Sequence, residues 1–273
     1  MVPCKIREPV VAGQFYPASA GQLKNQIEGF LDKKVAQKNV ITCMLPHAGY
    51  TYSGRVAAQT VSSLIVKEKV ILLGPNHTGL GRPYSIMTQG VWRTPLGEIS
   101  IDNYLAGKIL AGSKYLQEDA LAHLNEHSLE VELPILQYFK KDFQIVPIVL
   151  MSSDINALKE IGAEIASVLK EPGSKEKTLV VASSDMTHYE AQEEAVKKDR
   201  QAIEAILRLD PDELIEKISR YNISMCGYAP VVVMLTLAKL LGAKAGQLIK
   251  YETSGDITGD KESVVGYAGI TIY

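Results

Sequence analysis

Three histidines lie in short polar loops, and each loop follows a Val-, Ile- and Leu-rich run that predicts a buried strand. These residues are His47, His77 and His188. Parallel strands deliver their carboxyl ends to one edge of an open α/β sheet, and such sheets bind ligands at that edge. We therefore expect the three loops to meet in one cleft.

The side chains of these loops favour metal chemistry. His47 and His77 are the candidate imidazole ligands, and Cys226 lies just before an apolar segment whose helix N-terminus would stabilise a thiolate. Two imidazoles with a thiolate suit zinc, copper or ferrous iron better than magnesium or calcium. Two imidazoles with Asp185 would instead form a non-haem iron triad. Cys226 could equally be a buried structural cysteine, so both ligand sets stay open.

The remaining polar residues near these loops have alternative roles. His188 could be a ligand or an acid–base group, because its ordinary pKa of about 6.5 suits either role. His127 could line the pocket, whereas His123 is expected on the surface. Three further side chains adjoin the histidines and could line a substrate site or simply pack in their loops: Tyr50, Asn76 and Tyr189.

The pattern of apolar residues predicts an α/β fold. Buried strands are predicted at 40–45, 70–73, 144–150, 179–182 and 264–272. Helices are predicted at 22–33, 55–66, 156–170, 190–209 and 228–241. Asp154 is the predicted cap of the third of these, and Asp210 caps a further helix that begins at Pro211. This alternation predicts a central mixed, largely parallel sheet flanked by helices. A turn at 94–97, flanked by strand-like segments at 84–92 and 98–102, predicts a β-hairpin insert. Pro134 predicts a kink or a late start in the helical segment 126–139.

Composition excludes several classes of protein. The 29 basic and 31 acidic residues give a net charge of −2, which argues against a nucleic-acid surface. We expect no membrane span and no signal peptide. Three widely spaced cysteines, Cys4, Cys43 and Cys226, favour reduced thiols and a cytoplasmic location.

No linker divides residues 1–273, so a single domain is expected. P-loop, G-x-G-x-x-G and G-x-S-x-G motifs are absent.

Several ordered motifs together resemble the Memo family, which is labelled AmmeMemoRadiSam system protein B in prokaryotes. The motifs lie at 11–17, 46–50, 74–77, 92–97, 126–131, 184–188 and 226–227. The resemblance implies a Memo-like domain with a fold similar to class III extradiol dioxygenases. It also implies a metal position formed by two histidines and a cysteine, which match His47, His77 and Cys226. Further pocket residues of the family match three positions here: Asp185, His188 and His127.

The resemblance has one departure, because extradiol enzymes complete their iron site with a carboxylate where Cys226 stands here. Ring-opening activity is therefore not carried over on fold alone. The function we expect is a non-haem iron- or copper-dependent redox enzyme, with iron or copper preferred to zinc, acting on an unknown small substrate. His188 would shuttle a proton, assisted by Asp185, and His127 would hold a substrate atom.

Two other functions remain open from the sequence. The first is a non-catalytic adaptor that binds phosphotyrosine or other peptides in the same cleft, for which Arg55, Arg82 and Arg93 are the candidate basic residues. The second is a zinc-dependent hydrolase, although the H-E-x-x-H signature is missing. The family label also implies a pathway shared with AMMECR-type and radical SAM proteins.

Overall fold

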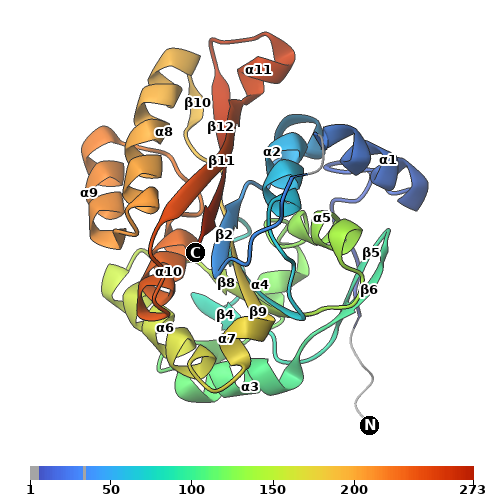
Figure 1. Ribbon diagram of the computed structural model, residues 1–273, viewed down its shortest axis with the longest axis vertical. Helices are drawn as coiled ribbons and strands as arrows, with labels where there is room; N and C mark the ends of the chain where they lie inside the picture. The colour runs from blue at the N-terminus through green and yellow to red at the C-terminus, as the bar shows by residue number, and fades with distance from the viewer. Residues whose placement is uncertain (1–5, 33–34) are drawn as a thin grey trace.

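The computed structural model describes residues 6–32 and 35–273, and its centre is a mixed β-sheet covered by helices on both faces (Figure 1). Across the sheet the strands are β10 (His188–Glu190), β12 (Val264–Ile272), β2 (Thr42–Leu45), β9 (Thr178–Ser183), β3 (Lys69–Pro75), β8 (Gln144–Leu150), β4 (Tyr84–Ile86) and β7 (Gln117–Glu118). A further strand, β11 (Gly246–Thr253), pairs with β12.

The four central strands, β2, β9, β3 and β8, are parallel, and β12 runs antiparallel to β2. Nearly every residue of the central strands is buried, which explains their uninterrupted apolar runs. Residues 144–150 and 264–272 form strands with the predicted bounds. The prediction of a mixed sheet with a parallel centre is confirmed.

Helices cover the two faces of this sheet in two groups. One group comprises α3 (Asn103–Gly112), α6 (Ile155–Leu169), α8 (Gln192–Leu207), α9 (Pro211–Tyr221) and α10 (Tyr228–Leu240). The other comprises α1 (Ala20–Phe30), α2 (Tyr50–Ser62) and α5 (Glu132–Phe139). Three short helices lie in the connections: α4 (Leu121–Leu124), α7 (Ser174–Lys177) and α11 (Ser254–Thr258). Buried side chains from the sheet and from both groups form one apolar core.

The capping and proline signals predicted from the sequence lie at the starts of α6, α9 and α5. The Asp154 and Asp210 carboxylates accept hydrogen bonds from the first-turn N–H groups of α6 and α9. Helix α5 begins only at Glu132, so Pro134 lies in its first turn, where a missing N–H costs no intrahelical bond. The late start at Pro134 is thus confirmed. The first helix was predicted to run to residue 33, but α1 ends at Phe30 and Leu31 is already extended. Residue 33 itself and Cys4 lie outside the described residues.

The hairpin insert is confirmed, but it is shorter than predicted. It consists of β5 (Val91–Thr94) and β6 (Gly97–Ser100), and β1 (Ile6–Arg7) adds a parallel strand to it. Strand β4, expected in the same hairpin, pairs instead with β8 at the far side of the central sheet. In the described part of the chain, no helix is long and apolar enough to span a membrane.

A buried ion pair ties the N-terminal segment to the loop before α5. The Glu130 carboxylate accepts hydrogen bonds from Arg7 Nη1 at 2.7 Å and from the Tyr16 hydroxyl at 2.6 Å. It also accepts the backbone N–H groups of Val10 and Val11. These contacts fix the loop 126–131, which carries several of the polar residues described next.

Candidate metal centre

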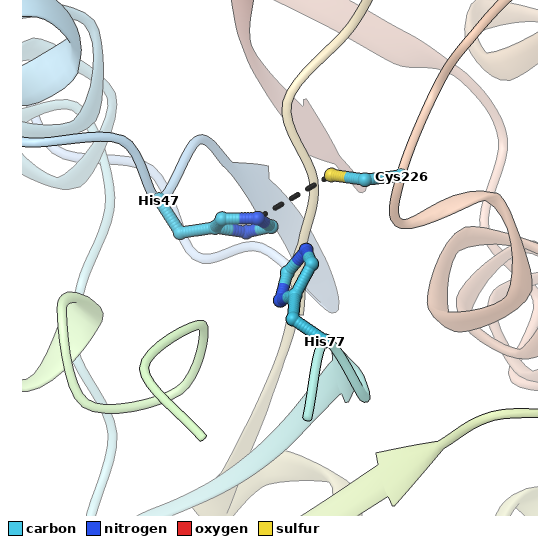
Figure 2. Close-up of side chains that lie close together, drawn as sticks. All are labelled: His47, His77 and Cys226. Carbon is cyan, nitrogen blue, oxygen red and sulfur yellow. Dashed lines mark hydrogen bonds between the residues drawn. The ribbon is translucent and has the colours of Figure 1, made fainter. Parts of the chain in front are cut away.

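Three side chains from distant parts of the chain converge at the carboxyl ends of the central strands. His47 follows β2, His77 follows β3, and Cys226 lies in the loop before α10 (Figure 2). One nitrogen of each imidazole and the Cys226 Sγ atom all lie within 4.8 Å of one another, so the three could hold a metal ion. The loops that follow β2 and β3 therefore meet at one point, as expected from the strand ends.

The spacing of these atoms fits a single ion. His47 Nε2 lies 3.3 Å from Cys226 Sγ. A metal with bonds of about 2.1 Å to nitrogen and about 2.3 Å to sulfur separates such ligands by about 3.1 Å at a right angle and about 3.6 Å at a tetrahedral angle. The observed distance falls between these values. The His47 and Cys226 atoms are thus spaced as ligands of one metal, and a His77 nitrogen lies within 4.8 Å of both.

His47 is oriented by the end of β9, which lies between β2 and β3 in the sheet. Its Nδ1 atom lies 2.7 Å from Ser183 Oγ, and its backbone N–H donates to Asp185 Oδ1 at 2.8 Å. Burial, with smaller contributions from the charges of His77 and His127, holds the pKa of His47 well below its usual range. The ring is therefore neutral at neutral pH, and Nε2 can offer a lone pair toward Cys226.

His77 is oriented by Glu126, a fully buried carboxylate. Glu126 accepts hydrogen bonds from the His77 backbone N–H at 2.5 Å, from His77 Nδ1 at 2.9 Å and from the Ser128 N–H at 2.9 Å. Burial alone would raise the pKa of Glu126, but the hydrogen bond and charge of His77 and the backbone N–H groups outweigh it and lower the pKa to about 2. A carboxylate on Nδ1 directs Nε2 toward the centre and makes it a stronger ligand.

Cys226 approaches the centre because the next residue is a glycine. A Cβ atom on Gly227 would lie 2.3 Å from the Ser183 carbonyl oxygen and 2.5 Å from Ser184 Cβ. The Asp185 backbone N–H donates to Cys226 Sγ at 3.3 Å. Helix α10 begins at Tyr228 as predicted, yet burial and the Asp185 charge raise the pKa of the Cys226 thiol. A bound cation would supply the charge that a thiolate needs here.

Asp185 supports the loop of His47. Its carboxylate accepts the backbone N–H of His47, and the Ala48 N–H also lowers its pKa. Burial outweighs these hydrogen bonds and raises the pKa of Asp185 to about 6. Among residues 6–32 and 35–273, the groupings that could hold an ion do not include Asp185. The geometry therefore favours the ligand set with Cys226 over the set with Asp185.

A second grouping, His77, Glu126 and His127, could also hold an ion. In this structure Glu126 accepts the hydrogen bond of His77 Nδ1, which is the arrangement of a carboxylate that orients a ligand. The His127 ring stacks on His77 with centroids 4.7 Å apart and meets Phe15 edge-on at 5.0 Å. His127 thus lies beside both imidazoles of the centre.

His188 is the first residue of β10, beyond the loop that follows β9. Its Nδ1 atom lies 2.8 Å from the Met186 carbonyl and 3.0 Å from the Ser224 carbonyl. Because carbonyls only accept, Nδ1 carries the proton and Nε2 is left as the basic atom. Asp199 of α8 secures this loop by accepting the Thr187 N–H at 2.9 Å.

The three residues considered for substrate contact lie in different environments. Tyr50 is 1% exposed and its hydroxyl donates to the Val131 carbonyl, so it packs in the core. The Asn76 side chain is occupied within its own loop, where its oxygen accepts the Thr78 and Gly79 N–H groups. Tyr189 is 77% exposed beside His188 and is the one of the three whose ring is free to meet a ligand.

The prediction that His123 lies on the surface is wrong. His123 is fully buried, with Nδ1 2.8 Å from the Asp119 carbonyl and Nε2 3.2 Å from the Pro147 carbonyl. Its ring also lies edge-on to Trp92. Burial lowers the pKa of His123 to about 4. The residue belongs to the packing beneath the hairpin rather than to the metal centre.

The basic residues considered for peptide binding come from three separate elements. Arg93 lies in the hairpin and pairs with Glu8 and Glu98. Arg55 lies in α2, and Arg82 lies in the loop before β4.

Comparison with known proteins identifies the family. A family model described as Memo-like protein matches residues 7–271. The chain belongs to this family. Similar proteins include a MEMO1 family protein from Aquifex aeolicus, 46% identical over 97% of this chain and 98% of its own length. Another, from Methanopyrus kandleri, is 44% identical over 97% of this chain and 98% of its own length.

The Memo-like chain also resembles a solved structure in fold. An uncharacterized protein from Escherichia coli K12 aligns with a TM-score of 0.57 at 12% identity, covering 86% of this chain and all of that chain. At this level of identity the likeness concerns the fold alone.

Sequence reasoning missed the residues that orient the ligands in this Memo-like protein. Glu126 directs His77, and Ser183 contacts both His47 and the buried Glu132. The acidic positions in Glu126-His127-Ser128-Leu129-Glu130-Val131-Glu132 were a usable signal, because three closely spaced carboxylates that lead into an apolar helix are buried only with specific partners.

Proposed function

We propose that this Memo-like protein is a metal-dependent redox enzyme that binds ferrous iron or copper through His47, His77 and Cys226. The observation that carries the proposal is the convergence of two imidazole nitrogens and one sulfur within 4.8 Å, each imidazole with its other nitrogen in a hydrogen bond. Three protein ligands leave further coordination positions for a small substrate.

The surrounding side chains support proton transfer beside such a metal. When bound, the ion would supply Lewis-acid and one-electron chemistry. His188 directs its Nδ1 proton to the Met186 and Ser224 carbonyls and follows Asp185 in the same loop, so its Nε2 atom is our candidate proton acceptor near the centre. Asp185 holds the His47 loop in place. His127, half-buried beside His77, can donate a hydrogen bond to a substrate atom.

The donor set also supports the choice of metal. Thiolate and imidazole ligands disfavour magnesium and calcium and leave zinc, copper and iron as candidates. Among these we prefer iron or copper, because the fold implied by the family resemblance is that of non-haem iron enzymes. If metal analysis finds zinc instead, the protein is better interpreted as a zinc-dependent hydrolase.

The test is the anaerobic loading of purified protein with iron or copper. We expect one ion per chain and a thiolate-to-metal absorption band that is lost in Cys226→Ser, while Cys43→Ser, at a buried strand position, retains it. His47→Ala should abolish tight binding. If the wild-type protein binds neither metal more tightly than His47→Ala, the proposal is wrong.

A further inference from the structure

A buried carboxyl group lies two hydrogen bonds away from the metal centre, and the proposed mechanism does not use it. Glu132 opens helix α5 and is fully buried. Its Oε1 atom lies 2.8 Å from Ser183 Oγ, and Ser183 Oγ in turn lies 2.7 Å from His47 Nδ1. The other carboxyl oxygen, Oε2, has no hydrogen-bond partner.

The single hydroxyl proton of Ser183 determines which of its hydrogen bonds Oγ donates and which it accepts. Three atoms surround this oxygen: His47 Nδ1 at 2.7 Å, Glu132 Oε1 at 2.8 Å and the Ser128 carbonyl at 2.8 Å. A hydroxyl has one proton to give and two lone pairs to accept with. The Ser128 carbonyl can only accept, so it must receive that proton. For all three contacts to be hydrogen bonds, His47 Nδ1 and Glu132 must both donate.

From this proton count we infer that Glu132 is a neutral carboxylic acid that donates to Ser183, in the same network in which His47 donates from Nδ1. Glu132 is in this sense a positioning residue: it holds Ser183, which accepts the His47 Nδ1 proton, so the Nε2 lone pair of His47 faces the centre. The inference builds on the proposed metal function, but it concerns the protonation of the metal-free protein.

The surroundings of Glu132 are consistent with a neutral acid. Burial raises its pKa well above the usual range and outweighs the hydrogen bond to Ser183. The groups whose charges act on it or that it acts on are Asp185 of the β9 loop, Tyr50 of α2 and Cys43 of β2, and all three are acids. An ionised Glu132 would also leave charge on an oxygen with no donor, which is costly in a buried site.

Without Glu132, Ser183 would lose one of its three partners and would hold the His47 ring less firmly. Glu132→Leu should therefore weaken metal binding by about 10- to 100-fold, as loss of an orienting partner does elsewhere. Glu132→Gln, whose amide can still donate to Ser183, should retain most of the affinity.

The decisive test measures unfolding of metal-free protein as a function of pH. Folded Glu132 keeps a proton that the unfolded chain releases above a pH of about 4.3, so unfolding becomes easier as pH rises. Relative to Glu132→Gln, the wild-type unfolding constant should increase about tenfold per pH unit from about pH 5 upward, until the folded group ionises. Glu193→Gln removes an exposed carboxylate and controls for net charge. Parallel curves for wild type and Glu132→Gln between about pH 5 and 8 would overturn the inference.

A second measurement needs no variant. Carbon-13 labelling of glutamate in the metal-free wild type should show one side-chain carboxyl signal that remains at the protonated position at neutral pH. If every glutamate carboxyl is ionised there, the inference is wrong even if Glu132→Gln fails to fold. Both measurements are made without metal, so a failure to bind iron or copper would refute the proposed function and leave the result for Glu132 standing.

Discussion

Replacement of Glu126 by glutamine tests how the protein orients His77. The substitution preserves shape but replaces an acceptor oxygen by an NH2 group. The wild-type carboxylate accepts three hydrogen bonds, two from His77 and one from the Ser128 N–H. The amide nitrogen would face at least one of these donors, so a buried N–H would lose its partner.

The structure gives the size of this effect. The pKa of Glu126 is lowered from 4.5 to about 2, and each unit corresponds to about 1.4 kcal/mol, so ionised Glu126 contributes about 3 kcal/mol to stability at neutral pH. Because the folded pKa is lowered, the contribution is complete above about pH 4.5 and is lost as pH falls toward about 2. Glu126→Gln should also bind metal about 10- to 100-fold more weakly.

The assay is urea unfolding of metal-free wild type and Glu126→Gln at neutral pH and again below about pH 4, with metal titrations at neutral pH. The gap in unfolding free energy should be about 3 kcal/mol at neutral pH and narrower in acid. Glu130→Gln is the matched control: it lies in the same buried segment but binds Arg7 and Tyr16, so it should destabilise the fold without changing metal affinity. Wild-type metal affinity in Glu126→Gln would refute the reasoning.

Two further predictions concern packing. Gly227→Ala would place a Cβ 2.3 Å from the Ser183 carbonyl, so we expect the free energy of unfolding to fall by about 1–3 kcal/mol and metal binding to weaken. In the control Gly107→Ala, in α3, the new Cβ meets nothing within 4 Å, so the free energy of unfolding should rise by up to about 1 kcal/mol. Thermal unfolding and metal titration compare the two variants. Arg7→Ala would leave the Glu130 carboxylate buried without its cation, so the free energy of unfolding measured in urea should fall by about 3–5 kcal/mol. The folded variant should still bind one metal ion per chain. A fall of less than about 1 kcal/mol would contradict the role of this ion pair.

The layered fold was predictable because the central strands are buried on both faces and therefore carry continuous apolar runs. Residues 144–150 and 264–272 show this directly. Strand β11 was missed because the residues of Gly246–Thr253 are mostly half-exposed and form no such run. The order of strands across the sheet depends on contacts distant in sequence, so periodicity alone could not give it.

The centre was predictable only in part. Histidines after buried strands pointed to His47 and His77 because strand ends gather at one edge. Cys226 lies 179 residues from His47, and nothing local indicates that its loop faces the same point. His123 was misplaced because a lone histidine in a short connecting segment gives no sign of burial, whereas the ring lies between two buried carbonyls, one of which accepts its single N–H.

The measurement that tests the metal centre most directly is a comparison of His47→Ala with His127→Ala by metal titration. Two groupings share His77, and these two variants separate them: one needs His47 and Cys226, and the other needs Glu126 and His127. Our account predicts that His47→Ala abolishes tight binding and that His127→Ala still binds one ion per chain. Tight binding in His47→Ala together with its loss in His127→Ala would contradict the assignment.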